Sequence, residues 1–287
     1  MVDVLLVTSR AWPQGEPGGE LLLQAFSERG IDAAWAIWDD DDVDWAGARL
    51  VALRSPWDYH ERFAEFLAWL SRIEADGARV LNGVDVVRWN TDKAYLVQLA
   101  EAGVPVVPTL LAEGEEELPA AIAEFGTAVV KPRTAAGGRG VVVFDMDEGG
   151  PADLDESRLE PGPWVVQPLV ESIRTEGEWS VYVLGGEAVS AARKVPGVGE
   201  IRVHEHFGGH TEAAELGAEQ ADVALRTVAG AEALLGHRLP YARVDAMRLA
   251  DGTLAVSELE VTEPGLYLDV LPQNAARFAD VVAAELT

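Results

Sequence analysis

The chain of 287 residues contains no cysteine, which excludes disulfide bridges, thiolate metal ligands and cysteine nucleophiles. It also lacks any apolar run of the roughly 18 residues that a membrane-spanning helix needs. Asp3 follows the first methionine almost at once, where a signal peptide would carry basic and then apolar residues. We therefore expect neither a membrane span nor a signal peptide, and we expect a cytoplasmic protein.

Positive charge is scarce, with 22 lysines and arginines against 49 acidic residues and a net charge of −27. Such a chain is a poor partner for nucleic acid or for an anionic membrane. Only three of its cations are lysines, namely Lys93, Lys131 and Lys194. Because arginine stands at nearly every other cationic position, these three mark places where a compact ammonium group is needed. Chance survival of the three lysines is the alternative.

The apolar content of 48% and nine tryptophans are typical of a globular protein with one large or two modest domains. The first 85 residues alternate strands and helices, which predicts a small α/β unit with a parallel sheet. We expect strands at residues 2–8, 31–38, 50–54 and 79–82, and helices at 19–29 and 60–76.

A polar and aromatic loop follows the third predicted strand. Ligands of open α/β sheets bind beyond the carboxyl ends of the strands, which is where this loop lies. Its candidate substrate contacts are Arg54, Ser55, Trp57, Asp58 and Tyr59. The alternative is a loop that only starts a helix, with Asp58 as its N-cap.

Three carboxylates gather in the stretch 241–261, which reads as two alternating strands around an Asp251-Gly252 turn. A two-residue turn places Asp245 opposite Glu258, and Glu260 on the same face. Like charges this close repel one another unless a cation lies among them or their pKa values rise. Oxygen ligands without His or Cys suit Mg²⁺. A solvated strand face is the alternative.

Two of the lysines lie in unusual places. Lys93 falls in the first turn of a helix predicted from an N-cap at residues 90–92 to residue 102, where the helix dipole disfavours a cation. An anionic ligand would explain that position, and a solvated surface lysine is the alternative. Lys131 ends a strand predicted at 127–132 and leads into a glycine-rich loop before a second strand at 141–144. Such a loop can fold as a flap whose amides approach phosphates. It is not a P-loop or a dinucleotide motif, because no helix follows it.

The remaining segments complete the expected organisation. His204 and His206 could together ligate a metal, although two exposed loop histidines are the more ordinary interpretation. Tyr267 is expected to be a core aromatic. We predict an acidic helix at 113–125, a Pro- and Gly-rich linker at 145–163, a strand at 164–169 that Pro168 breaks at a hinge, strands at 176–183 and 188–194, and helices at 212–235 and 273–286.

Taken in order, these motifs resemble the ATP-grasp superfamily over residues 86–287. The matching features are Lys93, Lys131, the flap 136–140, the hinge 167–170 and the Asp245…Glu258-x-Glu260 set. The peptides S-P-W-D-Y, G-E-W-S-V, E-I-R-V…F-G-G and L-E-V-T-E-P are most similar to the group that includes the O-ureido-serine cyclo-ligase of cycloserine biosynthesis. Bacterial glutathione synthetases are similar more distantly, and they typically have Asn where Glu260 stands.

The resemblance implies an α/β protein: a two-subdomain ATP-grasp fold of α+β type, preceded by a small α/β domain with a parallel sheet. The implied domains are residues 1–85, a first ATP-grasp subdomain with the flap at 86–168, and a second with the metal site at 169–287.

The resemblance also implies roles for individual residues. Asp245, Glu258 and Glu260 would hold two Mg²⁺ ions. Arg193, Lys194 and Arg202 would stabilise the transferring phosphoryl charge, and Arg243 would contact the substrate together with Glu263 and the loop 54–59. ATP would be bound by Lys93, Lys131, Ala136, Gly137, Gly138, Arg139, Gly140, Gln167, Pro168, Leu169, Val170 and Glu178.

The implied activity is that of an ATP- and Mg²⁺-dependent ligase. A carboxylate or ureido carbonyl of a small amino acid-like substrate would be phosphorylated, and an amine would then form a C–N bond with release of ADP and phosphate. The sharper form is an intramolecular cyclo-ligase. The alternatives are a non-catalytic nucleotide- or metal-binding module and a small-molecule kinase. A homodimer is compatible with the sequence.

Overall fold

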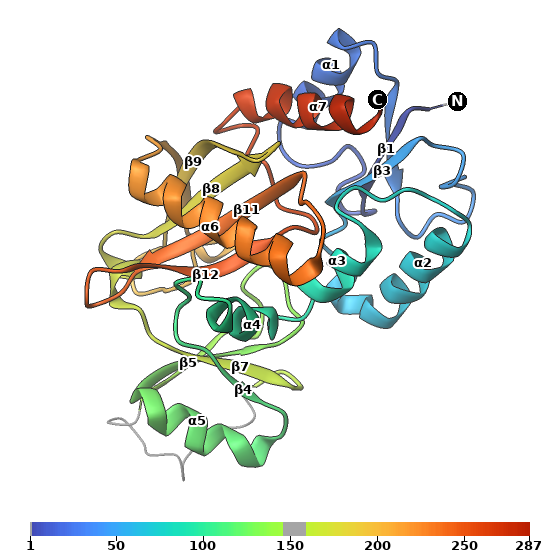
Figure 1. The fold of residues 1–287 in the computed structure, drawn as a ribbon. Helices are drawn as coiled ribbons and strands as arrows, with labels where there is room; N and C mark the ends of the chain where they lie inside the picture. The colour runs from blue at the N-terminus through green and yellow to red at the C-terminus, as the bar shows by residue number, and fades with distance from the viewer. Residues whose placement is uncertain (1, 146–158) are drawn as a thin grey trace.

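The structure is a computed structural model that describes residues 2–145 and 159–287 (Figure 1). The linker predicted at 145–163 lies largely outside the described residues. Three sheets follow one another along the chain: a three-stranded parallel sheet, a four-stranded antiparallel sheet and a five-stranded antiparallel sheet. The predicted α/β class, with a parallel sheet first, is confirmed. No helix within the described part of the chain has both the length and the apolar content to cross a membrane.

The parallel sheet has the order β2-β1-β3, built from β1 (Val4–Thr8), β2 (Ala33–Ile37) and β3 (Leu50–Ser55). Helix α1 (Gly19–Glu28) and helix α2 (Phe63–Ala75) flank it, and η1 (Tyr59–Arg62) leads into α2. The predicted fourth strand at 79–82 is wrong, because only Val80 forms a bridge, to Val51. Asn82 turns the chain away with a φ of 67°, and its side-chain amide donates to the carbonyls of Tyr241 and Val261 instead.

The helix predicted from an N-cap at 90–92 to residue 102 is present as α4 (Tyr95–Glu101), although it begins later than expected, and an additional, unpredicted helix precedes it. That helix, α3 (Val84–Asn90), ends where the single helix was expected to begin. Asp92 caps the entry to α4, since its carboxylate accepts from the Ala94 amide at 2.9 Å. Asn90 does not cap a helix, because its side-chain amide bonds Leu259 and Val261 of the five-stranded sheet.

The four-stranded sheet has the order β4-β7-β5-β6. Its hydrophobic face packs under α5 (Leu118–Phe125), which begins later than predicted because a bend at 113–114 and η2 (Glu115–Glu117) precede it. Figure 1 shows α5 against this sheet at one end of the molecule. The strands are β4 (Leu110–Ala112), β5 (Thr127–Pro132), β6 (Val142–Asp145) and β7 (Trp164–Pro168).

The five-stranded sheet has the order β10-β9-β8-β11-β12, with α6 (Ala218–Leu235) packed across one face (Figure 1). The predicted helix 212–235 starts too early, because residues 210–214 pair with β9 as an edge strand. Short 3-10 turns η5 (Glu171–Arg174) and η6 (Glu205–Phe207) lie in the connections. The strands are β8 (Glu178–Leu184), β9 (Glu187–Val195), β10 (His210–Ala214), β11 (Tyr241–Arg248) and β12 (Leu254–Glu260).

The predicted hairpin is formed by β11 and β12, but its turn is one residue longer than expected. Leu249 bonds Thr253 at 2.8 Å, so three residues rather than Asp251 and Gly252 alone connect the strands. A one-residue bulge at Ser257 restores the predicted register, with Asp245 opposite Glu258. The bulge also places Val256 in the core and Glu258 on the opposite face, although the two are only two residues apart.

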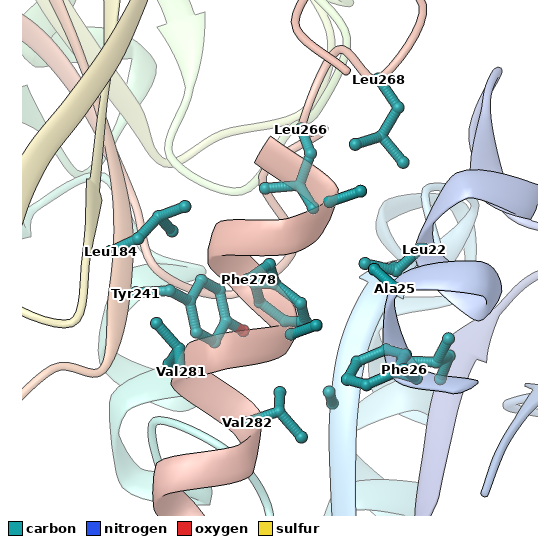
Figure 2. Packing of buried hydrophobic residues seen from close by; sticks show 14 of the residues in the cluster. Leu22, Ala25, Phe26, Leu184, Tyr241, Leu266, Leu268, Phe278, Val281 and Val282 are labelled. Atoms are coloured by element: carbon teal, nitrogen blue, oxygen red, sulfur yellow. The ribbon is translucent and has the colours of Figure 1, made fainter. Parts of the chain in front are cut away.

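Helix α7 (Gln273–Glu285) returns the end of the chain to its beginning. In Figure 2 its Phe278 lies between Tyr241 of the five-stranded sheet and Phe26 of α1. Val282 of α7 belongs to the same buried cluster. The first and last segments of the chain therefore share one core, and the domain boundaries at 85 and 168 stay a prediction.

Candidate active site

A cavity of about 140 Å³ lies between the four-stranded and the five-stranded sheets. Both sheets and the segments beside them contribute to its wall. Of the predicted site residues, it is lined by Lys93, Lys131, Ala136, Gly137, Gly138, Arg139, Gln167, Pro168, Leu169, Val170, Glu178, Lys194, Arg202, Arg243, Asp245, Glu258 and Glu260.

The three predicted metal ligands meet on the cavity face of β11 and β12. Oxygen atoms of Asp245, Glu258 and Glu260 lie within 4.8 Å of one another. Opposite ligands of an octahedral Mg²⁺ lie about 4 Å apart, so these oxygens need only a small adjustment to share an ion. Burial and the neighbouring carboxylates raise the pKa of Glu260 to about 8, which is the electrostatic cost of crowding like charges. The set fits a hard divalent cation.

Cations from the same sheet compensate these carboxylates in the structure. Lys194 donates to Asp245 at 2.9 Å and lies 2.7 Å from Glu178. Arg243 donates to both oxygens of Asp245 and also pairs with Glu260. Although burial opposes it, the two cations hold the pKa of Asp245 well below its usual range. Asp245 is thus ionised, as a metal ligand must be.

The other two lysines enter the cavity from different elements. Lys93 pairs with Glu258 at 3.0 Å and donates to the Ala135 carbonyl at 2.8 Å. Lys131 has no ion-pair partner among the described residues, and burial lowers its pKa. A half-buried ammonium group that makes no direct ion pair is suited to bind an anion, because a bound phosphate would supply a close counter-charge.

The glycine-rich segment forms a flap over the cavity. Gly137 and Gly138 both adopt positive φ, of 66° and 70°, as the sequence predicts for a tight loop. Arg139 reaches out of the flap to Glu61, at 2.8 Å. Gly140 does not line the cavity; a Cβ there would lie 2.8 Å from the ring of Pro132. The predicted nucleotide contact of Gly140 therefore has no support from its position.

Two further predictions of catalytic residues have different outcomes. Arg202 lines the cavity, but it pairs with Glu200 and lies 3.5 Å over the Phe207 ring. Arg193 does not line the cavity, because successive strand residues point to opposite faces and Lys194 takes the inner one. Its guanidinium pairs with Glu212 at 3.0 Å instead.

Three of the predicted substrate contacts form hydrogen bonds or ion pairs with other residues of the protein. Arg54 is completely buried, donates to the carbonyl of Pro264 and pairs with Glu16 at 3.4 Å. The hydroxyl of Ser55 bonds Thr8 at 2.8 Å. Asp58 accepts from the Trp38 indole at 2.8 Å rather than capping a helix. Because each of these three side chains is held by partners within the protein, none of them is free to contact a ligand.

The other residues of that loop converge on Glu263. The Trp57 indole donates to the Glu263 carbonyl at 3.2 Å, and the Tyr59 hydroxyl lies beside the Glu263 carboxylate. Burial raises the pKa of Glu263 to about 7, although Tyr59 and Lys93 act in the opposite direction. Nearby, the Tyr267 ring lies 5.5 Å from the Arg243 guanidinium, so this aromatic borders the site rather than only the core.

Sequence reasoning missed several residues of the site. Ser180 donates to Asp245 at 2.6 Å, and Ser257 donates to Glu178 at 2.8 Å. Both are single serines within strand patterns of the sequence, so no local signal marked them. His204 was considered as a metal ligand, yet no metal-type cluster of the described residues includes it. It lines the cavity by itself, 5.6 Å from His206 between ring centroids.

Comparison with known proteins places this geometry in a family. Residues 92–247 match the family description "Prokaryotic glutathione synthetase, ATP-grasp domain", and residues 4–82 match "D-cycloserine synthetase DcsG, N-terminal domain". The chain belongs to the ATP-grasp ligases. It is 35% identical over 92% of both chains to the cycloserine biosynthesis protein DcsG of Streptomyces lavendulae. It is 26% identical to glutathione synthetase of Neisseria meningitidis serogroup B, over 80% of this chain and 70% of that protein.

Solved structures agree with the family. The crystal structure of D-cycloserine synthetase DcsG superposes with a TM-score of 0.88 at 33% identity, over 99% of both chains. The ATP-grasp ligase PsnB, complexed with a phosphomimetic variant of its minimal precursor, Mg and ADP, shares the fold with a TM-score of 0.64, at 22% identity over 100% of this chain and 99% of that one. This ATP-grasp protein is accordingly an ATP-dependent ligase that forms C–N bonds.

Proposed function

We propose that this ligase acts on a small amino acid derivative and closes it into a ring. The observation that carries the proposal is the enclosed Tyr59–Glu263 pair beside the phosphate-binding lysines. Tyr59 is 5% exposed and Glu263 is 9% exposed, so both side chains are shielded from bulk water. A buried carboxylate with one hydroxyl partner is suited to the ammonium group of a small substrate. The 35% identity to a cycloserine biosynthesis protein points the same way.

ATP would lie between the two antiparallel sheets. Lys93 and Lys131 would neutralise its α- and β-phosphates, and the flap amides would cover the β- and γ-phosphates. The apolar wall beside Gln167–Val170 would receive adenine, and Glu178 would accept from the ribose hydroxyls. Asp245, Glu258 and Glu260 would hold two Mg²⁺ ions, which supply charge neutralisation at the phosphates.

The chemistry would proceed in two displacements. In the first, a carboxylate or ureido oxygen of the substrate attacks the γ-phosphorus, the bond to the bridging oxygen breaks, and ADP leaves. In the second, the amine of the same molecule attacks the activated carbon, loses a proton and expels phosphate. Lys194, Arg202 and Arg243 would stabilise the charge that develops on the phosphoryl oxygens, since such transfer depends mainly on positioning and electrostatics.

Product analysis tests the proposal directly. We would measure substrate-dependent ADP release with Mg²⁺ over a panel of D- and L-amino acids, ureido amino acids and small diamines, and analyse each mixture by mass spectrometry. The expected product of a hit is one water lighter than its substrate. A product joined from two molecules would contradict cyclisation, and a stable phosphorylated product would favour a kinase.

Glu258→Gln is the matched control for that assay. The variant keeps the size of the side chain but removes one negative charge from the proposed metal site. We expect it to lose most Mg²⁺-dependent ADP release, whereas ADP release from a contaminating ATPase would persist in the same preparation. Normal metal dependence in Glu258→Gln would show that Glu258 is not a metal ligand.

A further inference from the structure

His204 lines the cavity, yet the roles given above leave it without a function. Its Nδ1 atom is buried and has no hydrogen-bond partner in the part of the chain that the structure describes. A buried polar atom left unpaired costs about 1–3 kcal/mol, so such an atom at a ligand site is expected to find its partner in the ligand.

The position of the imidazole is fixed by its own loop and by the flap. The His204 carbonyl accepts from the amides of Phe207 at 3.0 Å and of Gly209 at 3.1 Å. On the other side lies Gly138, where an added Cβ would stand 2.8 Å from the His204 Nδ1 atom. Nδ1 therefore faces the flap, and only a residue without a side chain lets the flap come this close.

Burial and the neighbouring charges determine the protonation state of the imidazole. Burial, with the positive charge of Lys194 as the next cause, lowers the pKa of His204 to about 4. The ring is thus neutral near pH 7 and carries a single N–H. A neutral imidazole can donate that N–H to a phosphate oxygen without any proton transfer, beside the charges of Lys194 and Arg243.

We propose that His204 binds the terminal phosphate of ATP, with its Nδ1–H donating to an oxygen of the phosphoryl group that is transferred. The inference rests on the proposed nucleotide site, because the flap would cover the β- and γ-phosphates and Nδ1 faces the flap. His204 would then be a catalytic residue that distinguishes ATP from ADP and secures the flap on the triphosphate.

The test compares two nucleotides in two variants by calorimetric titration in the presence of Mg²⁺. His204→Leu keeps much of the volume without a donor, and His204→Asn restores a donor on a shorter side chain. For the β,γ-imido analogue of ATP we expect His204→Leu to bind about 10–100-fold more weakly than the parent protein, the range for a hydrogen bond to a charged group. For ADP we expect a change of less than about threefold, and we expect His204→Asn to recover most of the loss.

His206→Ala is the control, since this ring lies on the same loop and has no role in the proposed site. It should bind both nucleotides as the parent protein does. Equal losses for ADP and for the imido analogue in His204→Leu would mean that His204 only supports the flap, and no loss would mean that it has no role; either result overturns the inference. If the parent protein bound neither nucleotide, the nucleotide site itself would be wrong.

A second measurement needs no folded leucine variant. In protein labelled with ¹⁵N-histidine, the imido analogue with Mg²⁺ should move the His204 ring nitrogen resonances, and ADP with Mg²⁺ should leave them near their unliganded positions. His204→Asn assigns the signals by removing them. Identical spectra with the two nucleotides would contradict contact with the terminal phosphate.

Discussion

The three lysines of this chain all line one cavity, and they differ in their ion-pair partners. Lys194 is held between Glu178 and Asp245, and Lys93 is held by Glu258. Lys131 has no such counterion among the described residues. Because a compact ammonium group fits where a planar guanidinium does not, retention of lysine at these positions has a steric as well as an electrostatic reason.

The unpaired state of Lys131 leads to a prediction about binding and stability together. Lys131→Met removes a half-buried charge that makes no ion pair among the described residues, so the melting temperature of the unliganded protein should stay the same or rise. Affinity for Mg–ATP should fall about 10–100-fold, because the phosphates lose a charged donor. Calorimetric titration and thermal melting measure both. Lys93→Met is the contrast, because it breaks the pair with Glu258 and should lower stability as well; unchanged affinity in Lys131→Met would refute the phosphate contact.

Glu263 should make stability depend on pH. Its folded-state pKa of about 7 is raised above the unfolded value, so its contribution is fully present below the unfolded pKa of about 4.5 and is lost as pH rises through 7. Relative to Glu263→Gln, the metal-free parent protein should lose up to about 1.4 kcal/mol per pH unit within that window. Urea unfolding from pH 5 to pH 8 measures the difference. Glu101→Gln, on an exposed face of α4, is the control, and parallel curves for Glu263→Gln and the parent protein would contradict a buried carboxyl.

At the scale of single elements, the β11–β12 hairpin shows how one strand can contribute neighbouring side chains to both the core and the cavity. Ordinary alternation would put Val256 and Glu258 on the same side. The bulge at Ser257 separates them, so that Val256 joins the core under α6 while Glu258 enters the cavity. A longer turn and a bulge thus offset each other, and the pairing of Asp245 with Glu258 is preserved.

The flap is the second element whose geometry can be tested. Gly138→Ala places a methyl group where 2.8 Å separates it from His204, at a φ of 70°. We expect Mg–ATP affinity to fall several-fold while the melting temperature changes little, since the flap contributes little to the core. Gly236→Ala is the matched control, because its φ is 79° and nothing lies within 4 Å of the added Cβ. That control should cost about 1 kcal/mol of stability and leave nucleotide affinity intact.

At the scale of the whole molecule, the first and last segments of the chain fold together. Glu16 accepts from the Leu266 amide at 2.6 Å and pairs with Arg54, whose guanidinium lies 4.7 Å over the Phe278 ring. Trp57 and Tyr59 follow Arg54 in sequence and reach Glu263. The buried Glu16–Arg54 pair therefore sets the position of the amino-terminal unit relative to the segment 263–266.

Removing one partner of that pair should destabilise the protein. Arg54→Met leaves the Glu16 carboxylate without its buried counterion, which costs about 3–5 kcal/mol in comparable pairs. The double variant with Glu16→Gln should recover part of that loss. Urea denaturation measures both changes. If Arg54→Met unfolded like the parent protein and lost only substrate affinity, Arg54 would be a substrate contact as the sequence suggested.

Local pattern was enough for much of this protein. The parallel strands, the flap glycines and the Asp245–Glu258 pairing follow from spacing within short segments, because alternation and turn chemistry act between near neighbours. The ATP-grasp family followed from the resemblance of the motifs, taken in order, to known members. The sequence by itself therefore determined the fold class and the ligase family. The register near the metal ligands was also predicted, although the turn and bulge that produce it were not.

Only the tertiary structure decided which polar side chains face the cavity. Arg54, Ser55 and Asp58 looked like ligand contacts, but distant residues bind them inside the fold. Arg193 and Lys194 are adjacent in sequence, yet one pairs with the half-exposed Glu212 and the other with the buried Asp245. The place of helix α7 in the shared core, and of His204 against the flap, likewise depends on residues that are distant in the sequence. Burial and the pairing of charges are properties of neighbours in space, and a sequence does not state who those neighbours are.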